Sequence, residues 1–320
     1  MIKTLIVSFI FVLFACTREI EYDPGVVEHQ LVVNAYIQPN AMDTLLLSST
    51  YTTASQGVTG ARVVVTHQGD TVGRYIEKSK GLYCYQGEAF QENKDYQLEA
   101  SHPQFPSISA QTTVPVVPKF WFGTFANTNE KTQRTPYAHA QVLLELDDDE
   151  KTNNYYMVTS SSTYELKFRV GFPEERDSIV TRTEQDQLNS QSPIIEITNY
   201  SSYYDFAQLN YDWETNYGVH QDRIIFSDKL FNGQKASIPI DLSLFDARYT
   251  THIHLTLTSI SEEYYQLLRS LATLIKTENS LFPDALQMYS NIHNGHGIWG
   301  AKSSRTVTLD ITGNNLFNNK

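Results

Sequence analysis

The chain has 320 residues, with 24 Lys+Arg against 36 Asp+Glu, so its formal net charge is −12. Hydrophobic residues make up 41% of the chain and charged residues 19%, a composition that can bury a core and excludes a mainly disordered protein. The acidic excess argues against nucleic acid as a partner, because nucleic-acid binders neutralise phosphates with basic side chains, and the length suggests about two domains at roughly 150 residues each.

Residues 1–15 have the pattern of a secretory signal peptide. Lys3 supplies a positive charge, and Leu5–Ala15 is almost wholly apolar but too short to cross a bilayer. The sequence Leu13-Phe14-Ala15-Cys16 resembles the cleavage box of bacterial lipoproteins. That resemblance implies that Cys16 is acylated and that its acyl chains anchor the protein in a membrane. The alternative is an ordinary signal peptide with an incidental cysteine.

Residues 16–28 are expected to form a tether. Glu19, Glu21 and Asp23 make this segment acidic, and Pro24-Gly25 disfavours both helix and strand. An acidic stretch after the acylated cysteine resembles the surface-export signal of Bacteroidota lipoproteins. We therefore expect a lipid anchor in the outer membrane, with display at the cell surface favoured over a periplasm-facing position.

Cys84 is the second of two cysteines in the chain. If Cys16 is acylated, Cys84 has no cysteine with which to form an intramolecular disulfide, a Cys-based metal site or a redox pair. Its neighbours Leu82, Tyr83 and Tyr85 predict a strand, and we expect Cys84 to be buried as a small hydrophobic residue.

Residues 29–116 are predicted to form an immunoglobulin-like antiparallel β-sandwich. Short β-type runs alternate with Gly, Asn, Asp and Pro, and Gly69-Asp70 is predicted to be a hairpin turn. The Pro-bracketed connector Val114–Pro118 marks the expected domain boundary. The predicted strands are 31–37, 44–47, 61–66, 71–77, 81–85, 96–100 and 107–114.

Residues 117–320 are predicted to form a second, larger β domain, either a sandwich or barrel-like. We expect strand 155–161 to return from strand 138–146 as a hairpin, with the acidic run Asp147–Glu150 at its solvated tip. A surface calcium site is the alternative for this run, because calcium takes carboxylate oxygens. The predicted strands are 138–146, 155–161, 165–170, 178–183, 223–226, 236–240, 252–258 and 306–311.

One amphipathic helix is predicted near residues 260–276, where apolar residues recur at helical spacing. Ser259 followed by Glu262 fits a capping box at its start. We expect the helix to cover a sheet face or a barrel end, and a partner-binding helix is the alternative.

Two histidine pairs are weak candidates for metal ligands. His252 and His254 share one face of a predicted strand, and His293 and His296 flank a Gly-rich turn whose glycines already indicate tight backbone geometry. Neither pair has a third ligand at a fixed spacing, so we predict no metal site and no cofactor. The sequence contains no nucleophile elbow, zinc-protease helix or Walker loop, and it therefore predicts no catalytic residue.

Aromatic residues are concentrated between positions 200 and 217, among Asn, Asp and Ser. Amphipathic rings on a polar loop suit the binding of a carbohydrate, a peptide or a partner, because they bury a large area at small entropic cost. The alternative is that the rings pack back onto the sandwich. The candidate ligand- or partner-binding residues are Tyr200, Tyr203, Tyr204, Phe206, Tyr211, Trp213 and Tyr217.

Several segments together resemble one family of Bacteroidota outer-membrane lipoproteins, catalogued as domain of unknown function 4249. These segments are the lipoprotein box, Leu31–Ala35, Phe226–Gly233, Ile260–Tyr265 and the block Tyr289–Ala301, which is the most specific. The resemblance implies an N-terminal sandwich, a second β domain and genes that often lie beside TonB-dependent receptors. It carries over no residue-level function.

The favoured interpretation is a non-catalytic outer-membrane lipoprotein that acts as a binding or accessory module for a TonB-dependent receptor, with a glycan or peptide as its ligand. A surface hydrolase acting on a glycan or peptide, with unrecognised carboxylates, is the alternative. A structural protein of cell-surface assembly, with no small ligand, is the third interpretation.

Overall fold

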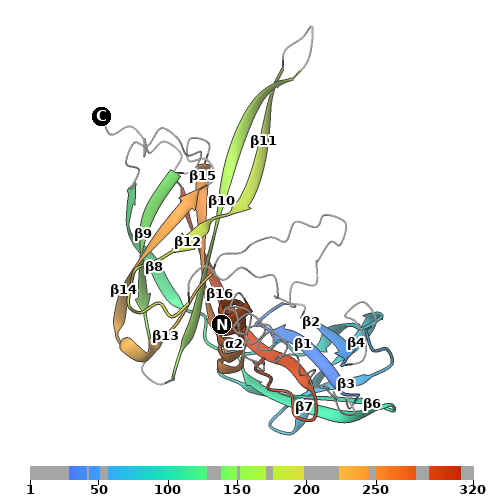
Figure 1. The fold of residues 1–320 in the computed structure, drawn as a ribbon. Coiled ribbons are helices and arrows are strands. Elements are labelled where there is room, and N and C mark those ends of the chain that lie inside the picture. The colour runs from blue at the N-terminus through green and yellow to red at the C-terminus, as the bar shows by residue number, and fades with distance from the viewer. Residues whose placement is uncertain are drawn as a thin grey trace, which may run out of the picture.

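A computed structural model describes residues 29–41, 43–50, 57–127, 138–149, 152–170, 176–197, 223–244, 250–278 and 288–310. These residues are mainly β-strand, arranged in two lobes (Figure 1) with one α-helix packed against the large sheet, and they confirm the predicted mainly-β fold class. The helix that the structure describes is not long and apolar enough to cross a membrane. The predicted signal peptide (1–15) and acidic tether (16–28) lie outside the described residues.

The first lobe is a single sheet that curls around its core. Its strand order is β16-β1-β2-β5-β4-β3-β6-β7, and the backbone bridge between Ser109 and His293 links β7 back to the segment before β16. The strands are β1 (Leu31–Ile37), β2 (Thr44–Ser49), β3 (Arg62–His67), β4 (Asp70–Ser79), β5 (Leu82–Gly87), β6 (Asp95–His102) and β7 (Phe105–Thr113). All seven strands predicted between residues 31 and 114 are present.

The second lobe is a sandwich of two sheets. One sheet has the order β12-β14-β9-β8, and the other layer continues the large sheet of the first lobe through β16-β15-β10-β11, with β13 paired to β10. The strands are β8 (Lys119–Asn127), β9 (Ala138–Asp147), β10 (Tyr155–Val170), β11 (Arg176–Gln185), β12 (Gln187–Asn189), β13 (Ile224–Ser227), β14 (Lys235–Leu244), β15 (Thr250–Ile260) and β16 (His296–Asp310). A short 3-10 helix, Asp228–Leu230, follows β13.

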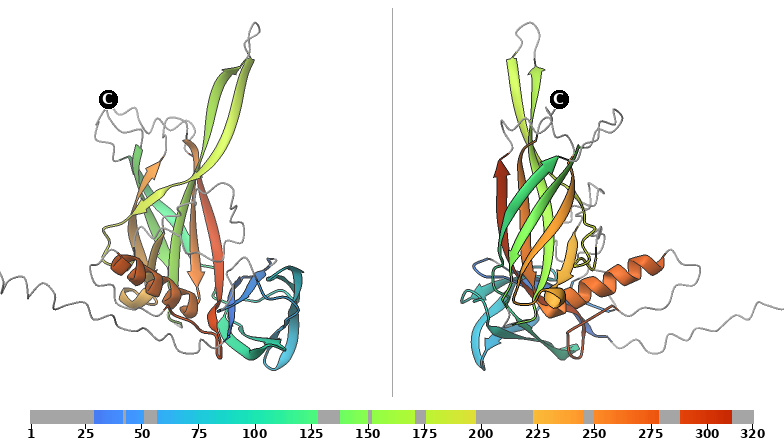
Figure 2. Two further views of the ribbon diagram at one scale, coloured as in Figure 1. Left: turned by 45° about the vertical axis from the view of Figure 1, so that its right-hand side comes forward. Right: turned by 90° about the vertical axis from the view of Figure 1, so that its left-hand side faces the viewer.

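Strand β16 is shared by the two lobes (Figure 2). Its first half, from His296 to Ala301, runs parallel to β1, and its second half, from Lys302 to Asp310, runs antiparallel to β15. The β1–β16 pair is the exception to the predicted antiparallel arrangement, since every other named strand pair in the described residues is antiparallel. The twelve-stranded sheet is therefore continuous from one lobe to the other.

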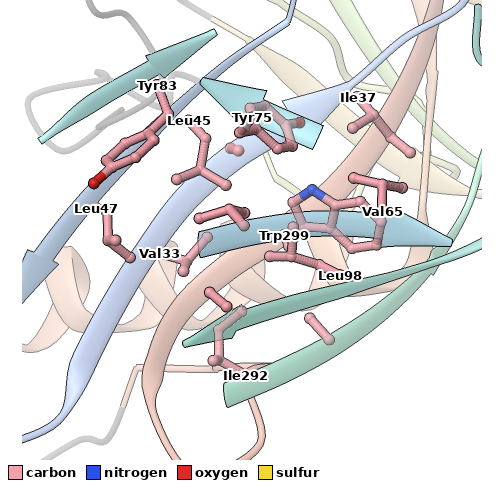
Figure 3. Packing of buried hydrophobic residues seen from close by; sticks show 14 of the residues in the cluster. Val33, Ile37, Leu45, Leu47, Val65, Tyr75, Tyr83, Leu98, Ile292 and Trp299 are labelled. Carbon is pink, nitrogen blue, oxygen red and sulfur yellow. The ribbon is translucent and has the colours of Figure 1, made fainter. Parts of the chain in front are cut away.

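The core of the first lobe draws on both ends of the described chain. Inward residues of β1 alternate along the strand, as Leu31, Val33, Ala35 and Ile37 do, and the fully buried Trp299 of β16 packs among them (Figure 3). Ile292 and Ala301 belong to the same core. The domain boundary at Val114–Pro118 stays a prediction, and the structure adds that residues 292–301 complete the core on its N-terminal side.

Cys84 was predicted to be buried, and this was wrong. The alternation of β5 turns Tyr83 inward and leaves Cys84 half-buried on the opposite face. The tight turn between β3 and β4 also differs by one position from the prediction. It is formed by Gln68 and Gly69, both with positive φ, and Asp70 is already the first residue of β4.

Helix α2 (Glu262–Glu278) confirms the predicted helix and covers a sheet face. Its residues Tyr264, Leu267, Leu268 and Leu271 are buried against Tyr36, Met157, Ile225 and Ile298 of the large sheet. The predicted capping box was wrong, because Ser259 still belongs to β15. Ser261 is the N-cap instead: its Oγ accepts a hydrogen bond from the Tyr264 amide at 3.4 Å, and its carbonyl accepts one from Tyr265.

The predicted hairpin of strands 138–146 and 155–161 was also wrong. Strand β9 pairs with β8 and β14 in one sheet, whereas β10 pairs with β11, β13 and β15 in the other. The acidic run is therefore part of a crossover between sheets. The prediction missed β8 and the first half of β16, because the sequence there is rich in aromatic and glycine residues rather than alternating. It also missed the three-residue strand β12, and it divided β10 into two strands, 155–161 and 165–170, although β10 is continuous.

Candidate functional site

The residues predicted to act in anchoring and binding lie outside the described residues. Cys16 is one of them. The aromatic set Tyr200, Tyr203, Tyr204, Phe206, Tyr211, Trp213 and Tyr217 is the other. Both remain predictions.

His252 and His254 lie on the outer face of β15 with their rings parallel and 6.2 Å apart. Hydroxyl groups occupy the nitrogens of His254: Thr163 Oγ1 is 2.9 Å from Nε2, and Thr308 Oγ1 is 3.0 Å from Nδ1. Within the described ranges, no group of three or more His, Cys, Asp or Glu side chains is arranged to hold a metal ion. His254 therefore belongs to a row of side-chain hydrogen bonds with threonine hydroxyls that crosses the neighbouring strands β10, β15 and β16.

The segment around His293 and His296 has a structural role. The Asn291 side chain both donates to the Trp299 carbonyl at 2.8 Å and accepts from the Trp299 amide at 3.0 Å, so it substitutes for a neighbouring strand. Gly297 has φ +102°, and a Cβ there would lie 1.9 Å from the Val33 carbonyl oxygen. The glycines therefore let β16 approach β1 closely.

Asp148 links separate segments of the chain through hydrogen bonds. The prediction that its acidic run forms the solvated tip of a hairpin was wrong for this residue. Its carboxylate accepts hydrogen bonds from Tyr156 Oη at 2.5 Å, from the Gly233 amide at 2.8 Å and from Asn154 Nδ2 at 3.2 Å. Nearby, Asp228 accepts from the Asn154 amide at 2.6 Å. These bonds hold the crossover against β10 and the turn before β14, while Asp147 and Asp149 on either side are exposed to solvent.

A pocket of about 320 Å³ lies where the two lobes meet, and we call it the junction pocket. Its volume falls at the lower end of small-ligand sites. The lining comes from the end of β7 and the connector, the start of β10, the end of β15 and the start of α2. The lining residues are Asn93, Thr113, Pro115, Val116, Thr152, Asn153, Asn154, Tyr155, Ser259, Ile260, Ser261, Glu262 and Glu263.

Hydrogen bonds between the lobes hold the walls of the junction pocket. Thr112 Oγ1 of β7 donates to Glu263 Oε2 of α2 at 3.0 Å, and Ser303 Oγ of β16 donates to the carbonyl of Pro115 at 2.6 Å. Ser261 Oγ accepts from the Ala301 amide at 3.1 Å, and the Ser261 amide donates to the Ala301 carbonyl at 2.9 Å. The pocket is therefore framed by fixed elements of both lobes.

The aromatic wall of the junction pocket is the Tyr155 ring. It stacks on Tyr265, with ring centroids 4.4 Å apart, and the Arg269 guanidinium lies 5.6 Å from the Tyr265 ring on α2. The Tyr265 hydroxyl donates to Glu196, whose other oxygen accepts from Ser227 Oγ at 2.5 Å. Burial acts to raise the pKa of Glu196, but these hydrogen bonds outweigh it and leave that pKa below its usual value. Tyr155 is thus supported from behind by a hydrogen-bonded cluster.

The electrostatic character of the junction pocket is negative. Burial, followed by the charges of Glu262, Asp228, Glu196 and Glu263, raises the pKa of Tyr155. None of the lining residues is Lys or Arg. The site can therefore accept hydrogen bonds and attract positive charge, with an aromatic ring and the apolar Pro115 and Val116 beside the carboxylates.

Sequence reasoning missed the junction pocket. Its residues come from four separate segments, and none of those segments carries a motif. The available signal was Ile260–Tyr265, which marks the helix start and which the family resemblance had already singled out. Nothing in the sequence placed that helix start beside Pro115 and Tyr155.

Comparison with known proteins gives one family. The family described as "Domain of unknown function (DUF4249)" matches residues 17–308. No curated protein matches the chain.

Among solved structures, the chain is similar to the one described as "Complete structure of manganese lipoxygenase of Gaeumannomyces graminis and partial structure of zonadhesin of Komagataella pastoris". The identity is 9%, with 74% of this chain and 90% of that chain covered and a TM-score of 0.20. It is also similar to collagen adhesin from S. aureus, at 8% identity, 88% and 94% coverage and a TM-score of 0.20. A biofilm-associated protein BSP domain matches at 7% identity, 92% and 61% coverage and a TM-score of 0.20. TM-scores this low carry no argument.

Proposed function

We propose that this chain, which belongs to the DUF4249 family, is a non-catalytic binding or accessory module whose binding site is the junction pocket. In this proposal a lipid on Cys16 holds the protein at the outer membrane, and the acidic tether sets the domains off from the bilayer. The partner is a TonB-dependent receptor, as the sequence resemblance implies. A glycan or peptide is the ligand that the module captures or passes on.

The observation that carries the proposal is the junction pocket itself. It is framed by both lobes, its walls are hydrogen-bonded in place, and an aromatic residue, Tyr155, and two carboxylates, Glu262 and Glu263, are part of its lining. Preformed sites with a few convergent polar groups are typical of binding modules, because little conformational entropy is lost when the ligand enters.

The hydrolase alternative has no comparable support in the described residues. Burial raises the pKa of Asp43 to about 7 and that of Asp186 to about 6, as a general acid would need. These two carboxyls lie in different lobes, however, and Asp186 is buried against Ser160 and Ser162. No cleft brings them to face one another.

The experiment is purification of the native full-length protein from gently solubilised membranes, followed by mass spectrometry of its partners. We expect a TonB-dependent receptor in the complex and an acylated Cys16 in the lipoprotein. Val116 is a lining residue and is 38% exposed, so the larger side chain of Val116→Trp is expected to fill part of the pocket. We expect this variant to reduce the amount of receptor recovered at least tenfold.

The matched control is Val180→Trp, which changes a valine of similar exposure, 37%, on the distant strand β11. We expect it to retain the receptor. A wild-type complex that never contains a receptor would overturn the accessory role. A receptor retained by Val116→Trp as well as by Val180→Trp would overturn the assignment of the pocket.

A further inference from the structure

We propose that the junction pocket receives the guanidinium group of an arginine side chain presented by a protein partner. This inference rests on the proposed function, because it names the chemistry that the binding site recognises. It concerns Tyr155, Glu262 and Glu263, whose functions neither the family nor the sequence motifs assign.

The charge of the pocket lining favours a cationic ligand. Glu262 and Glu263 stand in the first turn of α2, and the positive end of the helix dipole offsets roughly half of one elementary charge. Their combined charge therefore stays negative, and the lining itself contains no Lys or Arg. The nearby cations Arg269, on the Tyr265 ring, and Lys229, which acts on Glu196, lie outside the lining. Asp228 and Glu196 add to the field, since both act on the Tyr155 hydroxyl in the same direction as the two helix carboxylates.

The two carboxylates of the lining differ in the hydrogen bonds that they already accept. One oxygen of Glu263 is bonded to Thr112, whereas Glu262 is exposed and forms no hydrogen bond or ion pair within the described residues. A carboxylate of this kind in the lining of a pocket can take two parallel N–H donors from one guanidinium. Glu262 is therefore the expected bidentate partner, with Glu263 as a second acceptor.

The shape of the lining favours a planar cation. The Tyr155 ring is fixed by its stacking on Tyr265, so it offers a flat surface that does not have to be ordered on binding. A planar guanidinium stacks on such a ring better than a spherical ammonium does, and the Pro115 and Val116 side chains can contact the methylene stem. The combination of ring, carboxylate and apolar wall thus favours arginine over lysine.

Other ligand classes fit less well. A phosphate or carboxylate would be repelled by the same charges. A metal ion has no support, since the described part of the chain has no group of three metal-binding side chains. The arginine is assigned to a protein partner because the pocket opens between the lobes and holds one or two side chains by volume.

The test uses the full-length protein in mild detergent and two capped tripeptides, acetyl-Gly-Arg-Gly-amide and its citrulline counterpart. Citrulline is neutral but nearly the same shape, so the comparison isolates the charge. We expect calorimetry to show saturable binding of the arginine peptide, at least tenfold tighter than the citrulline peptide. Replacement of arginine by lysine is expected to weaken binding at least threefold.

The matched variants are Glu262→Gln and Glu165→Gln. Both remove one exposed carboxylate, but Glu165 lies on β10 outside the pocket lining. We expect Glu262→Gln to lower the affinity for the arginine peptide at least fivefold and to leave the affinity for the citrulline peptide unchanged. Glu165→Gln is expected to change neither affinity. Tyr155→Leu is expected to lower the affinity for the arginine peptide as well.

Equal affinities for arginine and citrulline would overturn the inference, as would identical effects of Glu262→Gln and Glu165→Gln. If the arginine peptide does not bind but Val116→Trp still releases the receptor, the proposed function stands and the arginine assignment fails. If the arginine peptide binds as expected and no receptor is ever recovered, the arginine assignment stands and the receptor role fails.

Discussion

In the first lobe a single sheet curls around the core, and the strands that supply the core come from both ends of the described chain. In the second lobe two sheets face each other across an aliphatic core, and most of its inward residues alternate along β9, β14 and β15. The difference matters because the first lobe cannot be completed until Trp299 arrives from the far end of the sequence. Strand β16 therefore supplies fully buried residues to the core of the first lobe, whereas its residues Val307 and Leu309 only pack against the core of the second lobe.

The polar groups buried in the two lobes differ as well. In the first lobe, Trp299 Nε1 and Tyr75 Oη have no hydrogen-bond partner among the described residues. In the second lobe, the buried Asp186 accepts hydrogen bonds of 2.6 Å from both Ser160 and Ser162. A buried polar group without a partner costs about 1–3 kcal/mol, so the two serine hydrogen bonds remove for Asp186 a cost that remains at Trp299 Nε1 and Tyr75 Oη.

Trp299→Ala is expected to have the largest effect, because it removes a fully buried ring from the shared strand. Loss of a core tryptophan should lower the free energy of unfolding by about 3–5 kcal/mol, measured by guanidinium denaturation. Trp299→Phe should cost less, since it keeps a ring and removes the unpartnered Nε1. Trp121→Ala, at a site 43% exposed, is the control and should cost less than either core change. Equal losses for Trp299→Ala and Trp121→Ala would contradict the shared-strand account.

A second comparison uses pH. Burial, opposed by the Gln38 amide and Lys302, raises the pKa of Asp43 from 3.8 to about 7, and burial raises the pKa of Asp186 to about 6. The folded protein therefore holds these protons after the unfolded chain has lost them. Each carboxyl therefore makes its full contribution to the free energy of unfolding below pH 3.8. That contribution falls as the pH rises from 3.8 to the pKa of the carboxyl in the folded protein.

Between pH 6 and 7 the main loss comes from Asp43, at about 1.4 kcal/mol or less over that unit. We expect Asp43→Asn to flatten the fall in unfolding free energy between pH 6 and 7, and Asp186→Asn to flatten it only below pH 6. Denaturation curves recorded at half-unit intervals from pH 4 to 8 check this. If both variants keep the wild-type slope everywhere, the buried carboxyls do not control the pH dependence.

The smallest effect expected of a single substitution on the free energy of unfolding concerns the link between the lobes. Ser261→Ala removes the N-cap of α2 and the bond to the Ala301 amide, and it should cost about 1–2 kcal/mol in thermal or chemical denaturation. Ser107→Ala, at an exposed position of β7, is the control and should stay within about 0.5 kcal/mol of wild type. A Ser261→Ala protein as stable as the control would show that the helix start does not hold the lobes together.

The fold class, the first seven strands and the single helix followed from sequence patterns. Alternating residues such as those of β6 and β14 have one buried face, and period-2 spacing reports that directly. The hairpin of β9 with β10 was wrong, because the side-chain pattern of each strand is the same whichever sheet it joins. Ser259 and Ser261 both precede a helical pattern, and only the length of β15 selects Ser261 as the cap.

Some candidate binding residues could be recognised in the sequence, and others could not. The aromatic cluster from Tyr200 to Tyr217 was visible in composition, but it lies outside the described residues and stays a prediction. Tyr155, Glu262 and Val116 gave no comparable signal, because each is an ordinary residue in its own segment. Their proximity depends on pairings between residues more than 100 positions apart, such as Tyr155 with Ile260.

By itself the sequence determined that the chain is acidic, mainly β and built with one amphipathic helix, since composition and periodicity are local properties. The glycines near His293 and His296 also indicated tight backbone geometry in that segment. The tertiary structure decided that β16 runs through both lobes, that Trp299 belongs to the first core and that a pocket opens at the junction. Those outcomes depend on which strands pair over long distances, and pairing is set by the fit of whole sheets rather than by any one segment.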